Sequence, residues 1–470
     1  MVGRSLATFS GKPAEYCTHL PDIAAKFLDA TSSYAIQGLN PGGIYKGIWA
    51  RDASFIIQDW FLSGKDLRIL MDEVVNIWSH QIATKGGIPA TKQGKKVVYG
   101  RGSPKLGYKM TDSAVLVPNH SFNGALPTTI FDNFAEVYGE KPDIDSTALM
   151  ISATSSILTA TIEKAMVSST KAQNIVAAQD DNGDVSYPNL LRVIDSLVPR
   201  LLEGIEYLKC QDIDDDGLLE QGYNEDWMDT ALRAGRIVYS QACWLLALRG
   251  LCSLLSLLGY SMLAEKMLGL AKQTIHAVEE KMWSEKDGCY VDLLHPSENY
   301  RTILTQDASL YLVALSEYLA DHIDDSQSMW GRSVFEGISQ EQIHCRTQRT
   351  LDTFRSKIWA KSEFEWPLVT SHALAKSGPR VLDKHEYHNH AFWPWITGIE
   401  MLARSRFGRL SECLLLLSTV ASEDGPKEYS LYEWVDPNTL VGKGAVPFRT
   451  GISSIRLAIA DIAMQQSGRK

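Results

Sequence analysis

Apolar residues recur every three or four positions along most of the chain, a spacing that places them on one face of an α-helix. The clearest stripe runs through Leu190, Ile194, Leu197, Leu201 and Ile205. Stripes of the same kind predict helices at 20–37, 51–64, 67–84, 145–165, 237–258, 261–283, 306–322, 393–406, 408–421 and 451–467, with weaker ones at 128–139 and 329–358. The pattern predicts an all-α protein of about a dozen helices.

Signals for β-strands are few, and we expect only short β patches, near 95–99 and 290–293. No segment rich in proline, glycine or serine divides the 470 residues into parts. A chain of this length can form two or three domains, but barrel folds of this size also exist as one unit. We therefore expect a single domain over residues 1–470.

One connection, residues 85–123, is much longer than the others. Connections of this length are usually functional or disordered. It is rich in glycine and basic, with a single acid, Asp112, set against Lys85, Lys92, Lys95, Lys96, Arg101, Lys105 and Lys109. Two interpretations stay open: a solvated insertion and a lid over an active site.

Composition narrows the class of partner. The formal net charge is −10, which argues against nucleic acid and against an anionic membrane surface as partners. The seven cysteines form no CxxC pair, so structural zinc and a disulfide framework are not expected, and a reducing compartment fits. Residues 1–19 carry no apolar run of signal-peptide type, and the apolar stretch 242–263 is interrupted by Arg249 and two glycines. We expect a cytoplasmic protein outside the membrane; whether it forms a homo-oligomer stays open.

Residues 222–230, a polar segment between two apolar stripes, contain the first candidate functional side chains. This segment, GYNEDWMDT, places Glu225, Asp226 and Asp229 around Trp227. Clustered acids repel one another, so a fold tolerates them most easily where they are solvated or have a function. Tryptophan stacks on apolar C–H faces, while carboxylates bind hydroxyls and transfer protons. The segment therefore indicates carbohydrate chemistry.

Three further loops share this mixture of aromatic and polar residues. Residues 49–52 (WARD), 388–395 (HNHAFWPW) and 432–437 (YEWVDP) each come shortly before a predicted helix. Tryptophans used only for packing fall more often inside an apolar stripe, as Trp60 does. Five of the twelve tryptophans instead lie in these loops, at positions 49, 227, 393, 395 and 434. The recurrence predicts a single face lined by aromatic and acidic side chains.

From about residue 20 to 465 the sequence resembles the six-hairpin glycosidases. These are (α/α)6 toroids that include glucoamylases, the glucosidase part of glycogen debranching enzymes and family 63 of the glycoside hydrolases. WARD at 49–52 looks like their W-x-R-D loop, which holds the terminal sugar. DWMD at 226–229 looks like the loop with their general acid, and "WMD" is closest to the debranching type.

Two downstream loops extend the resemblance. Residues 388–395 are similar to the H-N-G-x-x-W-P-W loop of these families, although His390 stands where glycine is usual. Glu433, followed by DPNT and the glycines at 442 and 444, looks like the general-base loop of family 63. The order and spacing of the four motifs imply an (α/α)6 toroid that binds carbohydrate and needs no metal or organic cofactor.

Cleavage of a glycosidic bond needs one carboxylic acid to protonate the leaving oxygen and one carboxylate to activate water. The acid must stay protonated near neutral pH, so apolar or anionic neighbours must raise its pKa. Asp229 has neighbours of both kinds and is our expected general acid, with Asp226 as the rival. Glu433 is the expected general base, and the alternative is a loop carboxylate paired with a nearby lysine.

Arg51 and Asp52 fit a substrate-holding role, because the carboxylate accepts from sugar hydroxyls while the guanidinium orients it. The alternative is a salt bridge that caps the following helix. For each tryptophan the alternative is core packing, and for the histidine it is a structural role. The full set of expected sugar-binding residues is Trp49, Arg51, Asp52, Trp227, His388, Trp393 and Trp434.

Residues 212–217 (DIDDDG) match two short motifs without satisfying either. They fit the early positions of a calcium loop, but Tyr223 occupies the twelfth position, where a glutamate is needed. They also match the D-x-D-D of class II terpene cyclases. We interpret them as an acidic turn ended by glycine. Asp145 and Asp307 precede predicted helices, and we interpret them mainly as N-caps.

We therefore expect an inverting glycoside hydrolase that releases a terminal, α-linked glucose or mannose from a small glycoside or oligosaccharide. The basic stretch within 85–123 leaves an acidic aglycone open. Alternatives on the same fold are a glycoside phosphorylase, a lyase and a sugar epimerase. A terpene cyclase built on helical hairpins and a carbohydrate-binding protein without turnover are the remaining alternatives.

Overall fold

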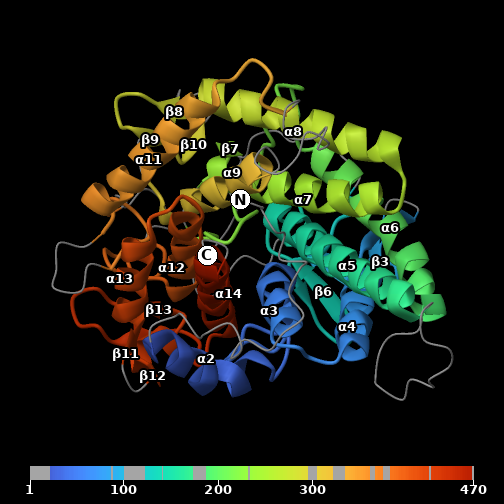
Figure 1. Cartoon of the computed structure of the whole chain (residues 1–470), viewed down its shortest axis with the longest axis horizontal. Helices are drawn as coiled ribbons and strands as arrows, with labels where there is room; N and C mark the ends of the chain where they lie inside the picture. The colour runs from blue at the N-terminus through green and yellow to red at the C-terminus, as the bar shows by residue number, and fades with distance from the viewer. Residues whose placement is uncertain are drawn as a thin grey trace.

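The computed structural model describes residues 22–85, 88–99, 122–139, 141–172, 187–230, 233–294, 304–320, 334–359, 366–373, 382–422 and 425–467. Within these residues the chain forms a double ring of α-helices (Figure 1). Successive helices alternate between an inner and an outer layer. The fold is thus the (α/α)6 toroid that the sequence predicts.

Among the described residues, six helices form the inner ring: α3 (Ala50–Leu62), α5 (Ile144–Ala172), α7 (Val238–Leu257), α9 (Ser309–Ala320), α12 (Pro394–Arg406) and α14 (Arg449–Ser467). Each packs against the next, and α14 packs back against α3, so the ring is closed. Most residues of α7 are buried, as expected for a helix with neighbours on every side.

The outer layer follows the same chain order. It consists of α2 (Asp22–Ala35), α4 (Leu67–Ser79), α6 (Tyr187–Lys209), α8 (Ser261–Lys281), α11 (Gln340–Lys357) and α13 (Leu410–Val420). Outer helices bury one face only. In α4 the buried residues include Leu70, Val74, Ile77 and Trp78, which lie four, three and one positions apart and so share one face of the helix. This stripe is the feature that makes the helices visible in the sequence.

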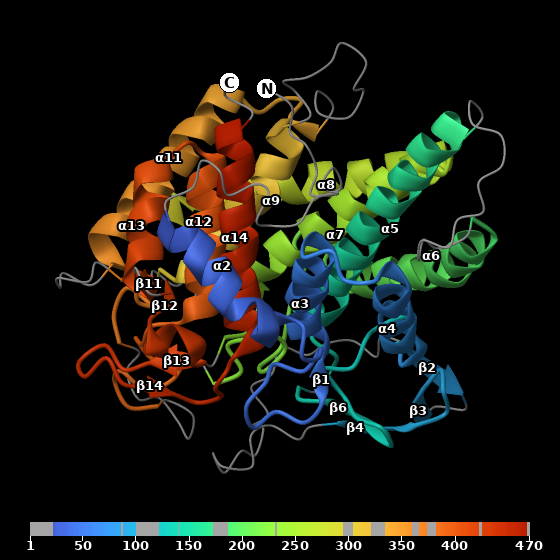
Figure 2. The ribbon, with the colours of Figure 1, turned by 60° about the horizontal axis from the view of Figure 1, so that its bottom comes forward.

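A six-stranded sheet lies at one end of the ring (Figure 2), and the sequence predicts little of it. The strand order is β1-β5-β6-β4-β3-β2, with only β4 and β6 parallel. The strands are β1 (Ile48–Trp49), β2 (Ile82–Lys85), β3 (Ile88–Thr91), β4 (Lys96–Tyr99), β5 (Thr129–Ile130) and β6 (Phe134–Val137).

The weak helix predicted at 128–139 is wrong, because β5 and β6 occupy it. Strand β6 pairs with β5 on one side and β4 on the other, and these ladders satisfy its backbone. A short apolar run cannot by itself distinguish a strand from a buried helix. The predicted helix at 67–84 also stops early, at Ser79, because β2 begins at Ile82.

Short two-stranded ribbons connect other parts of the ring. They pair β7 (Arg236–Ile237) with β10 (Leu293–Leu294), β8 (Trp283–Ser284) with β9 (Cys289–Tyr290), β11 (Ala421–Ser422) with β12 (Gly425–Pro426), and β13 (Trp434–Val435) with β14 (Gly442–Lys443). The β patches predicted near 95–99 and 290–293 are confirmed by β4, β9 and β10.

The acidic turn at 212–217 is confirmed as a solvated turn. The Asp214 side chain is 55% exposed, and Arg236 contacts both Asp214 and Asp216. Asp212 accepts the backbone N–H groups of Asp216 and Gly217. A terpene cyclase would need these carboxylates in an apolar cavity, so the structure speaks against that alternative. In the described chain, Asp212, Asp214 and Asp216 are the only group of three or more His, Cys, Asp or Glu side chains close enough to hold a metal ion, and Arg236 and Lys281 already pair with Asp214 and Asp216.

One described helix, α7, is long and apolar enough to cross a membrane by length and composition alone. Of its most apolar window, 67% is buried inside the protein. The place of α7 in the inner ring accounts for this composition.

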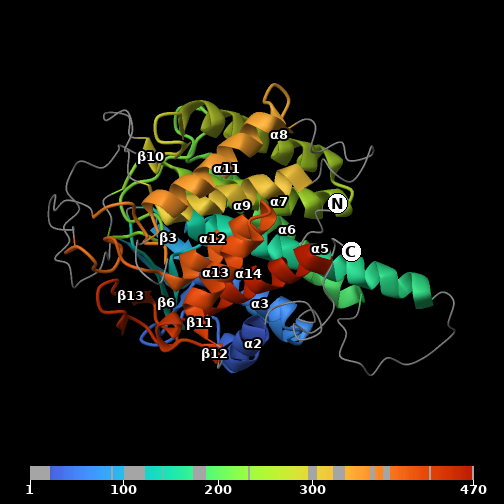
Figure 3. The ribbon, with the colours of Figure 1, turned by 60° about the vertical axis from the view of Figure 1, so that its left-hand side comes forward.

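The inner helices all begin at the same end of the ring. The segments that lead into α3, α5, α7, α9, α12 and α14 lie with the strands β6, β10 and β13 at this end, and α5 projects from the other (Figure 3). Free N–H groups at helix N-termini and the helix dipoles favour negative charge there. This end of the ring can therefore hold many carboxylates.

Candidate active site

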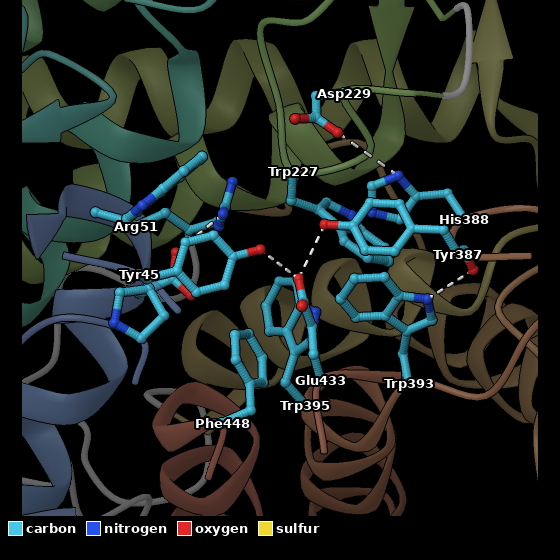
Figure 4. Close-up of a pocket in the computed structure, with 13 residues that line it drawn as sticks. Tyr45, Arg51, Trp227, Asp229, Tyr387, His388, Trp393, Trp395, Glu433 and Phe448 are labelled. Carbon is cyan, nitrogen blue, oxygen red and sulfur yellow. Dashed lines mark hydrogen bonds and ion pairs between the residues drawn. The ribbon is translucent and has the colours of Figure 1, made fainter. Parts of the chain in front are cut away.

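A pocket opens at the end of the ring where the inner helices begin. It is lined by Pro41, Tyr45, Trp49, Arg51, Asp52, Trp227, Asp229, Tyr387, His388, Trp393, Trp395, Glu433 and Phe448. Asp229 and Glu433 face it from different loops (Figure 4). All four loops singled out in the sequence contribute to this pocket.

Eight of the ten predicted site residues line the pocket: Trp49, Arg51, Asp52, Trp227, Asp229, His388, Trp393 and Glu433. Asp226 and Trp434 do not. Trp434 is the neighbour of Glu433 in an extended segment, where successive side chains point to opposite sides. Its ring is buried, with the Lys443 ammonium 5.0 Å from the ring centroid.

Asp226 is buried behind the pocket in a bonding network. Its Oδ2 accepts from Arg233 at 2.7 Å and from Gln221 at 2.8 Å, and its Oδ1 accepts the N–H of Met228. Arg233 also pairs with Asp292 and Asp307. These bonds hold the 226–229 loop, and they leave Asp229 as the carboxylate of that loop which faces the pocket.

Arg51 and Asp52 lie in the first turn of α3. Asp52 is buried, and its Oδ2 accepts from Arg51 at 2.9 Å while its Oδ1 accepts from Thr450 at 2.5 Å. The N-cap of α3 is Trp49, which makes no side-chain capping bond. Asp52 is therefore not the N-cap, although its charge suits a helix N-terminus. Both Arg51 and Asp52 remain on the wall of the pocket.

Asp229 has the environment of a protonated acid. Burial is the main cause that raises its pKa to about 7, with smaller contributions from Asp226, Glu433 and Asp145. Arg51 opposes the shift. The side chain is 24% exposed, but only toward a narrow pocket, so bulk water solvates it poorly.

Glu433 has the environment of a bound carboxylate. Its Oε1 accepts from the hydroxyls of Tyr45 at 2.6 Å and Tyr387 at 2.9 Å, and its Oε2 accepts the N–H of Ala445 at 2.9 Å. The pKa of Glu433 is raised overall, because burial outweighs the opposing effect of these three donors. A Cβ at Gly444 would lie 2.3 Å from Oε2, so only glycine lets the backbone approach the carboxylate.

Tyr45 and Tyr387 are the main site residues that sequence reasoning missed. Each hydroxyl is held protonated, because burial and the Glu433 charge raise its pKa. Tyr387 directly precedes the His388 motif, and this adjacency is the one local signal that could have indicated it. Tyr45 lies 388 residues from Glu433 along the chain, so no local pattern connects them.

We expect Tyr387→Phe and Tyr45→Phe each to move the acidic limb of the pH–activity profile to higher pH. Each change removes a donor that favours the ionised form of Glu433, so the pKa of Glu433 rises. A hydrogen bond to a charged group contributes about 1.5–3 kcal/mol, so kcat/KM should fall by about ten-fold or more. Tyr429→Phe is the matched control, because its hydroxyl bonds to the Thr419 carbonyl outside the pocket. An acidic limb that stays in place in both variants would contradict this role.

His388 is neutral in this pocket. Burial lowers its pKa well below the usual value, with the charges of Arg233 and Arg51 adding to the effect. Its Nδ1 lies 2.7 Å from the Thr230 hydroxyl and 3.7 Å from Asp229 Oδ1. The ring stacks on Trp393 at 4.8 Å between centroids. The imidazole thus packs beside Asp229 without bringing a charge to it.

The loop that carries Tyr387 and His388 has an unusual backbone. His385, Tyr387 and His390 have φ of +70°, +50° and +66°, in the left-handed region that favours glycine. The positive φ of His390 is a conformation that glycine adopts more readily than histidine. Here the His390 ring stacks on His385, and its Nδ1 lies 2.8 Å from the Thr370 carbonyl. Such backbone strain is typical of functional sites.

The tryptophans form two groups around the pocket. Trp227 packs edge-on against Trp393 and Trp395, and its Nε1 donates to Asp307 at 2.7 Å. Asp307 lies in the 3-10 turn η4 (Gln306–Ala308) and binds Arg233, so it is part of the buried network rather than a simple N-cap. On the other wall, Trp49 packs against Tyr138 at 5.0 Å.

The described part of the basic connection lies away from the pocket. Lys92 pairs with Glu203 of α6, and Lys95 Nζ lies 3.3 Å from His80 Nε2. Strand β4, which begins at Lys96, is three strands from β1 and so roughly 14 Å from Trp49 at about 4.8 Å per strand, and none of the described lysines of this stretch lines the pocket. Residues 86–87 and 100–121, Arg101, Lys105 and Lys109 among them, lie outside the described residues, so the lid hypothesis stays untested.

The closed double ring, with its polar and aromatic pocket at the N-terminal ends of the inner helices, places the chain in the six-hairpin toroid class of folds. Solved structures share this fold. The chain is similar to a family 63 mannosylglycerate hydrolase from Thermus thermophilus in complex with glucose, at 14% identity and a TM-score of 0.54. The alignment covers 93% of this chain and 98% of the Thermus protein.

Two other comparisons agree on the fold. An uncharacterized conserved protein from Thermus thermophilus matches at 14% identity with a TM-score of 0.56, over 91% of this chain and 98% of that one. A bacterial glucoamylase in complex with acarbose matches at 11% identity with a TM-score of 0.50, over 89% of this chain and 49% of that one. The sequence matches no protein-family model and no curated protein.

Proposed function

We propose that the protein is an inverting glycoside hydrolase, with Asp229 as general acid and Glu433 as general base. The observation that carries the proposal is the contrast between two carboxyl groups that face one pocket. Burial raises the pKa of Asp229 to about 7, while three donors hold Glu433. Carboxyl groups whose environments differ in this way suit the acid and base roles.

The chemistry divides between the two side chains. Asp229 donates its proton to the glycosidic oxygen as the bond to the anomeric carbon breaks. Glu433 takes a proton from a water molecule, which attacks the opposite face of the sugar and inverts the anomeric configuration. The donors on Oε1 and Oε2 fix the orientation of the Glu433 carboxylate, so that it can act on a water in one place.

The proposed substrate is a small glycoside or oligosaccharide with a terminal α-linked glucose or mannose. Arg51 and Asp52 supply donors and acceptors for hydroxyls, and the indoles of Trp227, Trp393 and Trp395 supply apolar walls. The similar Thermus hydrolase holds glucose in one of its structures, and its name gives mannosylglycerate as substrate. The described lysines of the 85–123 stretch give no support to an acidic aglycone, because none of them lines the pocket.

The electrostatics of the pocket argue against a glycoside phosphorylase. A phosphorylase binds phosphate where a hydrolase holds its base and nucleophilic water. In this pocket the buried Glu433, with Asp52 nearby, would repel a phosphate dianion there. The three donors around Glu433 are already used by its own carboxylate. Hydrolysis therefore fits the pocket better than phosphorolysis.

The deciding experiment is a panel of disaccharides and simple α- and β-glycosides of glucose and mannose, incubated with the protein. NMR of the first product identifies both the sugar and its anomeric configuration. We expect release of one terminal sugar with inverted configuration, independent of added orthophosphate. Net retention would overturn the mechanism, orthophosphate dependence would establish phosphorolysis, and binding without turnover would establish a carbohydrate-binding protein.

A further inference from the structure

Asp145 is a buried acid that the proposed reaction does not use directly. It lies in the first turn of α5, is 0% exposed and does not line the pocket. Sequence reasoning treats it as an N-cap, but the structure places it inside the helix and against Arg51, whose Nη1 lies 3.6 Å from Asp145 Oδ2. Tyr239 of α7 donates to the same oxygen at 3.2 Å. Asp145 is thus held between two neighbouring inner helices.

Arg51 is the cation that these carboxyl groups share. It binds Asp52 at 2.9 Å and contacts Asp145 at 3.6 Å, and it is itself a wall of the pocket. The same guanidinium is the strongest influence that favours the ionised form of Asp229. A general acid needs the opposite, because it must carry a proton when the substrate binds. Burial outweighs the effect of Arg51, and any group that also limits this effect helps to keep Asp229 protonated.

We propose that Asp145 is a positioning residue which holds Arg51 away from Asp229 and thereby keeps Asp229 protonated for the reaction. The proposal rests on the proposed function of Asp229 as general acid. Asp145 acts in two ways: its contact draws the guanidinium toward the base of α5, and its negative charge disfavours a second negative charge on Asp229. It touches neither substrate nor the reacting atoms.

The titratable groups around Asp229 come from every side of the pocket. They are Arg51 of α3, Asp145 of α5, Asp226 of its own loop, Glu433 before β13, the neutral His388 before α12, and the hydroxyls of Tyr45 and Tyr387. Asp145 in turn faces Arg51, Asp52, Asp143, Asp226, Tyr239 and Cys243. Asp145 is the acid in this set that both contacts Arg51 and lies outside the pocket wall.

The test is the pH profile of kcat/KM for Asp145→Asn. The amide keeps the size of the side chain and an oxygen for Tyr239, but it removes the charge. We expect the alkaline limb, where Asp229 loses its proton, to move to lower pH. For a limb displaced by one pH unit, activity above the limb falls about ten-fold relative to wild type, while the plateau below it changes far less. An alkaline limb that stays in place or moves upward would overturn the proposal.

Asp461→Asn is the matched control. It is the same change at another buried aspartate of an inner helix, but Asp461 of α14 binds Arg406 of α12 instead of Arg51. We expect its alkaline limb to coincide with that of wild type. A purely structural role for Asp145 would lower activity at every pH and leave the limb in place. If Asp145→Asn does not fold, Tyr239→Phe removes the donor that favours the charge on Asp145, and it should move the limb in the same direction by less.

Asp229→Asn separates this inference from the proposed function. If the alkaline limb of wild type persists in Asp229→Asn, Asp229 is not the general acid and the proposed function fails at that point. If Asp229→Asn abolishes the limb but Asp145→Asn leaves it where it is in wild type, only the role of Asp145 is wrong.

Discussion

Glu433→Gln is expected to lower kcat by about 10²–10⁴-fold, the range that a positioned general acid or base contributes. Glutamine has nearly the same shape and still accepts from Tyr45 and Tyr387, but it cannot take a proton from water. Sugar binding should persist, because Arg51 and the tryptophan walls are unchanged. Steady-state kinetics and calorimetric titration with the released sugar measure the two quantities separately.

Glu428→Gln provides the control for Glu433→Gln. It makes the same substitution five positions earlier, at an exposed residue of the 3-10 turn η5 (Glu428–Leu431). We expect wild-type kinetics from it. Removal of a general base should lower kcat by far more than ten-fold. If Glu433→Gln keeps more than about a tenth of the wild-type kcat, another group activates the water.

Asp229→Asn is expected to impair cleavage in a way that depends on the leaving group. Asparagine cannot donate an acidic proton, so kcat for alkyl glycosides and disaccharides should fall by about 10²–10⁴-fold. Glycosyl fluorides need little protonation of the leaving group, and their turnover should fall much less. The comparison of both substrate types in one variant measures the acid role directly.

Asp226→Asn distinguishes the two acids of the loop. Asp226 binds Arg233, Gln221 and a backbone N–H, so its replacement disturbs a buried network. The expected result is a lower free energy of unfolding, because removal of one partner leaves buried charge uncompensated. Equal sensitivity of disaccharides and glycosyl fluorides is expected in this variant. If the leaving-group effect appears in Asp226→Asn rather than in Asp229→Asn, the acid assignment is reversed.

The helices could be predicted because each one carries its own signal. Outer helices such as α4 and α6 bury one stripe, so apolar residues recur at helical spacing in the sequence. The sheet could not be predicted in the same way. Its strands are two to four residues long, and they are stabilised by partners elsewhere in the chain, as β6 is by β4 and β5. A run of that length contains too few residues to show a period.

The candidate site likewise contains residues with a local sequence signal and residues without one. Asp229 and Glu433 lie in loops whose local composition marks them, and the structure brings both to one pocket. Trp434 has the same local signal, yet it faces away from the pocket because it alternates with Glu433. The hydroxyl of Tyr45 and the contact of Asp145 with Arg51 depend on distant parts of the chain. Local composition identifies a loop, but only tertiary structure shows which of its side chains enter the pocket.

The closure of the inner ring also bears on biosynthesis. The pocket needs residues from Pro41 to Phe448, and α3 meets its last neighbour only when α14 docks. A chain still emerging from the ribosome therefore holds Arg51, Asp52 and Asp229 without Glu433 opposite them. Such long-range contacts form slowly, because most of the chain must be ordered first. The complete pocket is thus a property that the nascent polypeptide gains only after the hairpin of α13 and α14 has been synthesised.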